Sequence, residues 1–403
     1  MFPDISMNTQ IFNGKRLKEA LQFREKKMTE LATETGISKQ SLSLYANNCN
    51  VPPFDNVIKI AQALNFPTEF FMSEDLCTVT TGNTYFRSQA SATKKSRNAQ
   101  KIKLEYVSKM YEVLLQYINV PELNIPDVTA IDIIEDVADV DSEQAINEIE
   151  KLAKLIRGHW KLGDGPIDNL QYVLQSNGII VTGFRDVDMN IDAFSQQITI
   201  DGKVVYIIAL AIGSKPIERL RFDMAHELGH ILMHTWGEDN EEISKDEFNL
   251  REKQANMFAS AFLLPKESFS KSVSAYPTNI DYYHALKKKW KVSMQAMMYR
   301  TRQLDIISAN QFQYMMRIMS KNGNRRHEPG DKPGEIGDTI FQAALDMLFD
   351  GGYLTVRELL KEFGRYGIFL SKNDLENLMY LRKGTLFQES KVIPFMTVKN
   401  NLE

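Results

Sequence analysis

The chain has 403 residues, more than a single hydrophobic core usually serves, so we expect two or three domains. With 43% hydrophobic and 25% charged residues and a net charge of -4, its composition is typical of a globular protein and excludes a disordered or fibrous chain. Cys49 and Cys77 are too few for a disulfide framework, and no apolar run approaches the ~20 residues that span a bilayer, so we expect a cytoplasmic protein with no membrane partner.

The N-terminal region, residues 8–76, is predicted to be an all-α module of short helices. Gly36 permits a tight turn between two of these helices, and Ser38 is a natural N-cap for the helix that follows. The start of that helix carries side chains of the types that hydrogen-bond base edges or contact a thymine methyl group. We therefore predict that the DNA-contacting residues of this helix are Ser38, Lys39, Gln40, Ser43 and Leu44.

This module resembles the XRE (Cro/CI-type) family of helix-turn-helix repressors. The resemblance rests on the small Ala32, the Gly36 turn, the apolar Ile37, the Ser38 cap and the later run VPPFDNVIKIAQAL over residues 51–64. It implies that double-stranded DNA is a partner. The alternative is a module used only for protein contacts, because residues 1–75 carry about as many acids as bases.

Residues 77–103 are predicted to be a basic linker or arm, because their first part is rich in Thr, Ser and Asn and has few large apolar groups. Their cations meet no acid before Glu105, and we predict that three of them neutralise DNA phosphates and make the affinity salt dependent: Lys94, Lys95 and Arg97. Residues 104–154 are predicted to be a helical connector with an acidic segment. For both charged runs the alternative is a solvated helix face.

The middle of the chain alternates between helical and strand patterns. Strand-like runs lie near residues 179–182, 193–200 and 204–210, and two long helices are predicted over 217–234 and 244–264. We therefore expect an α+β domain over residues 155–320 with a small, antiparallel sheet. A polar linker over 321–337 then leads to a helical C-terminal region, residues 338–390, which we expect to serve in sensing or in forming a homodimer.

The strongest chemical motif is FDMAHELGH at residues 222–230, on the first of these long helices. His226 and His230 are four residues apart, so one helical face can direct both imidazoles at a single Zn²⁺. Glu227 is turned ~100° from His226, where its carboxylate can reach a water molecule held by the metal without being a ligand. Glu227 is therefore the predicted catalytic base of a hydrolase.

A catalytic zinc generally takes three protein ligands. His234 is excluded, because on one continuous helix it lies ~12 Å along the axis from His226. We predict Glu252 instead, since an antiparallel helical hairpin brings it back to the histidines. Asn256, one turn later, is predicted to orient a histidine from behind. The alternative for Glu252 is an ordinary solvated glutamate.

Residues 155–310 resemble the ImmA/IrrE family of zinc metallopeptidases. The motifs that carry the resemblance are WKLGDGPI at 160–167, GIIV at 178–181, DAFS at 192–195, the histidine motif, EKQANMFA at 252–259 and LLP at 263–265. The resemblance implies that two histidines and a downstream glutamate bind the metal and that the glutamate within the motif is the general base. Gln254 departs from the pattern, since an acid is common at its position.

Together these features predict a DNA-binding transcriptional regulator whose zinc-dependent endopeptidase domain cleaves a repressor-like protein or the chain itself. The resemblance also implies this kind of substrate, and the strand near residues 194–200 is expected to receive an extended substrate by strand addition. The alternative is a transcription factor whose peptidase-like domain is a non-proteolytic sensor of a metal or small molecule. An intact Glu227 favours the enzyme, because a sensor has no evident need for a general base.

Overall fold

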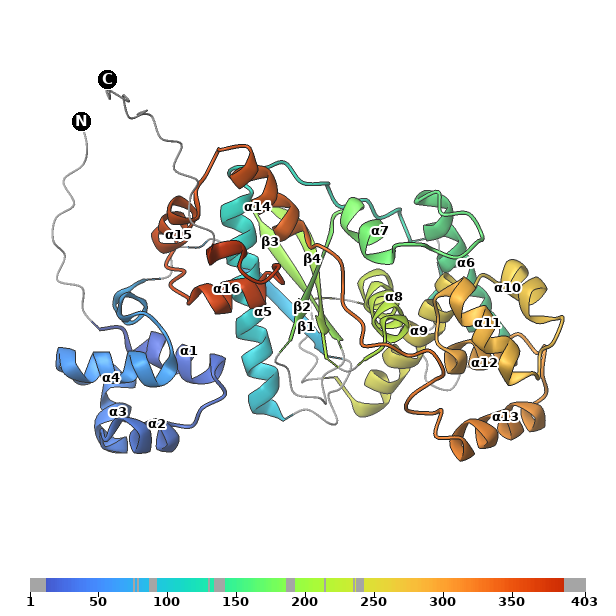
Figure 1. Cartoon of the computed structure of the whole chain (residues 1–403), viewed down its shortest axis with the longest axis horizontal. Coiled ribbons are helices and arrows are strands. Elements are labelled where there is room, and N and C mark those ends of the chain that lie inside the picture. The colour runs from blue at the N-terminus through green and yellow to red at the C-terminus, as the bar shows by residue number, and fades with distance from the viewer. Residues whose placement is uncertain are drawn as a thin grey trace, which may run out of the picture.

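The computed structural model describes residues 12–74, 77, 80–86, 93–129, 131–133, 142–185, 193–213, 215–234, 236 and 243–387. Residues 8–11 of the predicted N-terminal module and 388–390 of the predicted C-terminal region lie outside them, as does part of the acidic segment. The N-terminal module consists of α1 (Gly14–Phe23), α2 (Met28–Thr35), α3 (Lys39–Ala46), α4 (Phe54–Leu64) and the short 3₁₀ helix η1 (Thr68–Met72) (Figure 1). In the described part of the chain, no helix has the length and apolarity that crossing a membrane requires.

The turn between α2 and α3 is built as its sequence predicts. Gly36 adopts a left-handed conformation with φ 71°, which favours glycine, and ends α2. The Ser38 hydroxyl accepts a hydrogen bond from the backbone N–H of Ser41 and so caps the first turn of α3. Leu31, Leu42 and Ile60 are fully buried between the helices and hold the crossing of α2 and α3.

The predicted linker is ordered in two places. Residues 80–86 form strand β1 (Thr80–Phe86), and α5 (Lys94–Leu114) begins well before residue 103, so these parts of the predicted linker or arm have regular secondary structure. Thr93 caps α5 by accepting a hydrogen bond from the backbone N–H of Ser96. The small residues Ser96 and Ala99 are buried, so a lack of large apolar groups did not mean an absence of packing.

A four-stranded sheet of order β1-β3-β4-β2 forms the centre of the described structure. Strand β2 (Ile179–Phe184) pairs in parallel with β4 (Lys203–Ala211), whereas β3 (Ala193–Ile200) is antiparallel to both β4 and β1. The sheet is therefore mixed, and the prediction of an antiparallel sheet is wrong for this pair. The apolar run of β4 suits a strand that lies inside the sheet and is covered on both faces.

Helices cover both faces of the sheet (Figure 1). On one face Ile208 and Leu210 join a core with α8 (Ile217–Met233) and α9 (Lys245–Leu263). On the other face Ile207 and Ala209 join a core with α5 and the C-terminal helices. The remaining helices of the middle region are α6 (Glu143–His159), α7 (Leu170–Ser176), α10 (Lys266–Val273), α11 (Ile280–Trp290), α12 (Met294–Gln303) and α13 (Ala309–Lys321).

The segment that follows α13 is packed and is not a free linker. Glu328 is buried, pairs with Lys287 and accepts hydrogen bonds from the first backbone N–H groups of α12. Pro333 then forms a β-bridge with Pro216, at the start of α8. The chain continues into α14 (Ile340–Asp350), α15 (Val356–Arg365), α16 (Lys372–Leu378) and the 3₁₀ helix η3 (Thr385–Phe387).

The C-terminal helices also contact the N-terminal module. Arg24 of α1 makes a two-pronged ion pair with Asp374 of α16, at 2.7 and 2.6 Å. The buried Arg16 donates hydrogen bonds to the carbonyl of Gly367 and to the hydroxyl of Tyr106 on α5. The architecture confirms the predicted fold class, α+β with an all-α N-terminal domain and a helical C-terminal region.

Candidate metal centre

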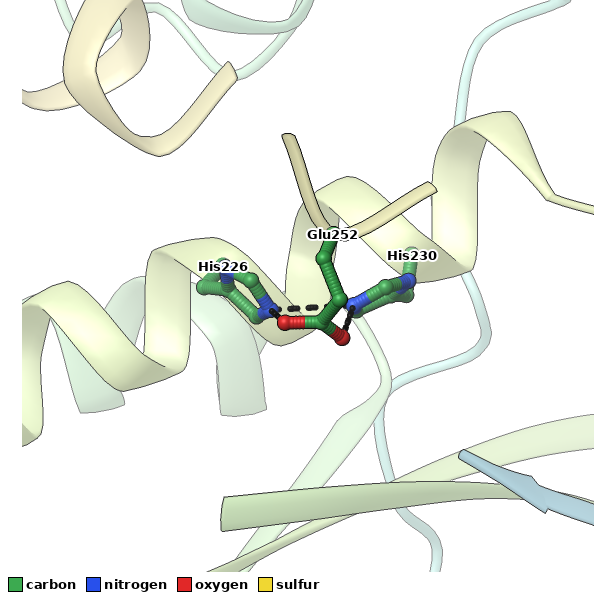
Figure 2. Close-up of side chains that lie close together, drawn as sticks. All are labelled: His226, His230 and Glu252. Carbon is green, nitrogen blue, oxygen red and sulfur yellow. Dashed lines mark hydrogen bonds and ion pairs between the residues drawn. The ribbon is translucent and has the colours of Figure 1, made fainter. Parts of the chain in front are cut away.

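Helices α8 and α9 pack antiparallel, and three potential metal ligands meet between them. Figure 2 shows the side chains of His226, His230 and Glu252 directed at one another. The Nε2 atoms of His226 and His230, one turn apart on α8, are 2.9 Å from each other. The two carboxylate oxygens of Glu252 on α9 lie 3.5 Å from His226 Nε2 and 3.3 Å from His230 Nε2. Within the described residues, these three side chains are the group that can hold a metal ion.

A hydrogen bond to Asn256 on α9 fixes the tautomer of His226. Nδ1 of His226 lies 3.1 Å from Oδ1 of Asn256, and the Asn256 amide nitrogen donates to the backbone carbonyl of Glu252 at 2.8 Å. Because the amide nitrogen of Asn256 donates to Glu252, the amide oxygen of Asn256 faces the imidazole ring of His226 and accepts the Nδ1 proton. The Nε2 atom of His226 therefore presents a lone pair to Glu252, and Asn256 lies where the sequence predicts an orienting residue.

His234 and Gln254 do the same for His230, and sequence reasoning missed this role. Helix α8 ends at Met233, and His234 has an extended backbone, so its Nδ1 atom lies 2.8 Å behind Nδ1 of His230. His234 Nε2 lies 3.1 Å from Oε1 of Gln254. Burial, and then the neighbouring His230, lower the pKa of His234 well below its ordinary value, so its ring is neutral.

The protons of this chain of side chains can be placed in order. Neutral His234 donates its Nε2 proton to Gln254, so its Nδ1 atom accepts the proton on Nδ1 of His230. His230 is left with a lone pair on Nε2, directed at the same point as the lone pair of His226. Glutamine at 254 needs only its oxygen for this task, which explains why the departure from the acid at this position leaves the cluster intact.

The converging atoms fit a divalent cation. Two imidazole lone pairs and a carboxylate lie close together in a buried site. A bound metal ion would offset the repulsion between these electron-rich groups. Burial by itself raises the pKa of Glu252, but the neighbouring imidazoles of His226 and His230 outweigh burial and lower it to about 2, so the carboxylate is charged. The donor set of two nitrogens and one carboxylate is one that Zn²⁺ takes in hydrolases.

The role of His234 can be tested by substitution. We expect His234→Ala to weaken metal binding by ~10 to 100-fold, because His230 then loses the partner that sets its tautomer. Gln254→Glu should keep the metal, since a carboxylate also accepts the Nε2 proton of His234. Competition against a chromophoric chelator measures both affinities. Unchanged affinity in His234→Ala would show that the hydrogen bond at Nδ1 does not orient the ligand.

The catalytic candidate Glu227 follows His226 on α8 and is fully buried. Its Oε2 atom accepts a hydrogen bond of 2.5 Å from the hydroxyl of Ser195, which lies on β3 and is also buried. Ser195 was missed as a site residue, although it belongs to the DAFS motif at residues 192–195. The structure therefore links strand β3 directly to the carboxylate predicted to be the base.

The predicted DNA-contacting residues lie at the surface of the N-terminal module. Lys39, Gln40 and Ser43 are exposed along α3, and Leu44 is half-buried. Ser38 is exposed as well, although its hydroxyl is engaged in capping the helix.

The basic residues of the predicted arm lie on α5. Lys94 and Lys95 are exposed in its first turn, and Arg97 is half-buried. The pKa of Glu30 on α2 is lowered, first by a hydrogen bond from the backbone N–H of Lys27. The positive charge of Lys95 contributes to the same shift. Further along α5, Nζ of Lys103 lies 5.9 Å from the ring centroid of Phe23 on α1, so α5 packs beside the helix-turn-helix module.

Two family models match the chain. Residues 14–75 match a helix-turn-helix domain, and residues 176–302 match the IrrE N-terminal-like domain. Both matches confirm the predicted fusion of an XRE-type helix-turn-helix with an ImmA/IrrE-like peptidase domain. The second match contains His226, Glu227, His230 and Glu252. No curated protein matches the chain.

Proposed function

We propose that this chain, which joins a helix-turn-helix domain to a domain similar to the N-terminal domain of IrrE, is a DNA-binding regulator with zinc-dependent endopeptidase activity. Its substrate is a repressor-like protein that also carries a helix-turn-helix, or a second copy of the chain. The observation that carries this proposal is the convergence of His226, His230 and Glu252 beside the buried carboxylate of Glu227.

The residues of the site have separate tasks in peptide hydrolysis. Zinc, when bound, supplies a Lewis acid that lowers the pKa of water to near 7. Glu227 accepts the proton of the attacking water and delivers it to the departing amine. Ser195 holds the Glu227 carboxylate in one orientation through the hydrogen bond to Oε2, so that the base does not rotate away from the reacting atoms. Asn256 and His234 keep the two histidines in the ligand tautomer.

A cavity of ≈ 1150 Å³ reaches the metal cluster from the side of Glu252 and Asn256. Cations outnumber acids on its wall, and the cations are Lys215, Arg219, Lys253, Arg302 and Arg325. Ion pairs with Asp223 and Asp305 engage Lys215 and Arg302. With the charge of Glu252 committed to the metal, the wall is positive, and it favours a substrate segment with acidic side chains near the scissile bond.

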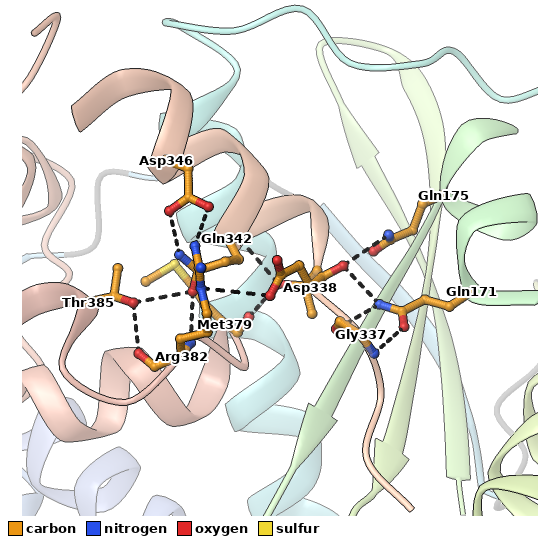
Figure 3. A network of polar contacts seen from close by, with 10 residues as sticks. Gln171, Gln175, Gly337, Asp338, Gln342, Asp346, Met379, Arg382 and Thr385 are labelled. Atoms are coloured by element: carbon orange, nitrogen blue, oxygen red, sulfur yellow. Dashed lines mark hydrogen bonds and ion pairs between the residues drawn. The ribbon is translucent and has the colours of Figure 1, made fainter. Parts of the chain in front are cut away.

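The C-terminal region contacts both the peptidase domain and the DNA-binding module. Figure 3 shows its polar contacts with α7. The Gln171 side chain on α7 accepts from the backbone N–H of Gly337 at 2.7 Å and donates to the carbonyls of Gly337 and Asp338. The helices that follow hold Arg24 of α1 through Asp374. We infer that residues 338–387 transmit changes between the two domains. Their predicted role in sensing stays a prediction. A homodimer stays a prediction.

Substitutions on the two basic surfaces should separate base reading from phosphate binding. Lys39→Ala with Gln40→Ala is expected to reduce the preference for a specific operator by about 10-fold or more, because each good base contact discriminates by ~1 to 3 kcal/mol. Lys94→Ala with Lys95→Ala should weaken binding to all DNA and lower the salt slope by about 2, because each lysine neutralises one phosphate. Competition assays at several salt concentrations measure both. Equal loss of preference from the two pairs would contradict this division.

The substrate proposal is tested with purified repressors of the helix-turn-helix type. The panel should include the Glu227→Gln form of this chain as a substrate, because it carries such a domain and cannot act on itself. We expect wild-type chain in catalytic amounts to cut at least one member in a chelator-sensitive reaction. If none is cut with zinc present, cleavage of a repressor-like protein is excluded for that panel, and a non-proteolytic sensor becomes the better account.

A further inference from the structure

Strand β3 contacts the catalytic candidate Glu227 through Ser195, and its outer edge is occupied by β1. Thr84 pairs with Gln196, Tyr85 with Ser195, and Phe86 with Phe194. β1 comes from the segment between the N-terminal module and α5, so it is not part of the stretch that matches the IrrE-like domain. An extended segment from outside the matched domain therefore lies antiparallel along this edge.

Ser195 links this strand pairing to the catalytic candidate. Its hydroxyl contacts Glu227, and its backbone is paired with β1 on one side and with β4 on the other. A peptide that adds to the sheet at this edge brings its backbone to the strand that holds the base. In the structure this edge is already paired, and His226 and Glu227 are both 0% exposed.

We propose that the outer edge of β3 is the binding surface for an extended peptide and that β1 is its intramolecular occupant. The structure is then a self-occupied form, and a peptide substrate must replace β1 through the same backbone hydrogen bonds. What happens to the peptide afterwards rests on the proposed function, but the exchange of strands does not.

β1 has the properties of a strand that can leave. It is a seven-residue edge strand, and its pairing with β3 is irregular between Thr81 and Thr84. That irregular stretch contains Gly82 and Asn83, which are among the residues least favoured in strands. When an edge strand leaves, the unpaired N–H and C=O groups of the strand beside it become a template for pairing with another chain.

The exchange can be measured without hydrolysis, in the full chain carrying Glu227→Gln. The probe is a fluorescein-labelled synthetic peptide with the sequence of residues 78–92, and its binding is followed by fluorescence anisotropy. Because the tethered strand has an effective concentration of about 1 mM, micromolar peptide should bind the unmodified edge poorly. Adding Thr84→Pro and Tyr85→Pro removes two backbone donors from β1 and should tighten peptide binding at least ~10-fold.

The matched control replaces the same residues with valine, which keeps both N–H groups and favours a strand. The valine pair should bind peptide as weakly as the parent, and metal content and DNA binding show that all forms are folded. Equal peptide affinity in the proline and valine pairs would overturn the proposal. If peptide affinity rises while the wild-type Glu227 chain hydrolyses no substrate, strand exchange stands and the proposed peptidase function fails.

A second measurement needs no substitution. In hydrogen exchange of the wild-type chain, amides of residues 80–86 should exchange at least ~10-fold faster than those of β4 in the middle of the sheet, because β1 opens alone. Protection of β1 equal to that of β4 would make it a permanent strand and would overturn the proposal.

Discussion

Replacing His230 with alanine is expected to abolish stoichiometric zinc binding. The substitution leaves one imidazole and the Glu252 carboxylate, which is too few protein ligands for a tightly held catalytic zinc. His226→Ala should have the same effect, because the Nε2 atoms of both histidines meet at one point with Glu252. Metal analysis of the purified variants after dialysis gives the zinc content per chain directly.

A matched control for these variants is His284→Ala, which changes a histidine on α11 outside the metal cluster. This variant should keep one zinc per chain, as the wild type does. Stoichiometric zinc persisting in His230→Ala would show that the ion binds elsewhere and would remove the basis for the proposed function.

Replacing Glu227 with glutamine is expected to separate metal binding from catalysis. The amide keeps the size of the side chain but cannot accept a proton, so hydrolysis should fall by about 10² to 10⁴-fold, the usual contribution of a general base. Zinc content should stay near one per chain, because Glu227 is not among the converging ligands. The measurement is the rate of cleavage of a verified substrate together with metal analysis of the same sample.

The cleavage rate and the zinc content of Glu227→Gln also distinguish an enzymatic function from a sensor function. Loss of hydrolysis with retained zinc supports Glu227 as the base. Full activity of Glu227→Gln would place the base elsewhere. If wild type and variant regulate a DNA target equally and neither cuts a repressor, the peptidase-like domain acts as a sensor, which is the alternative that the sequence leaves open.

Local patterns in the sequence were sufficient to predict that His226, His230 and Glu252 lie close together. The four-residue spacing of His226 and His230 sets their common face, and the apolar periodicity of 217–234 and 244–264 predicted helices that the structure confirms with small shifts at the ends. Glu252 could be placed because a short connection between two such helices makes them antiparallel. The metal roles of these side chains stay predictions, although their geometry agrees.

Long-range contacts were not accessible in the same way. His234 was judged by helix geometry alone, and its contact with His230 depends on where α8 ends and on Gln254 from another helix. Likewise, residues 80–86 lack an alternation of apolar side chains, so the local sequence pattern does not predict that they pair with β3. The contact of Ser195 with Glu227 arises from the packing of α8 on the sheet, which spacing along the chain does not reveal.

The most direct test of the central claim is cleavage of a repressor protein by the purified chain, followed by mass spectrometry of the fragments. Four samples suffice: wild type, wild type with a chelator, the chelated sample with zinc restored, and Glu227→Gln. We predict one defined fragment boundary in the first and third samples, and none in the second and fourth. Identical fragments in all four samples would assign the cleavage to a contaminating protease and contradict the account of this site as a zinc peptidase.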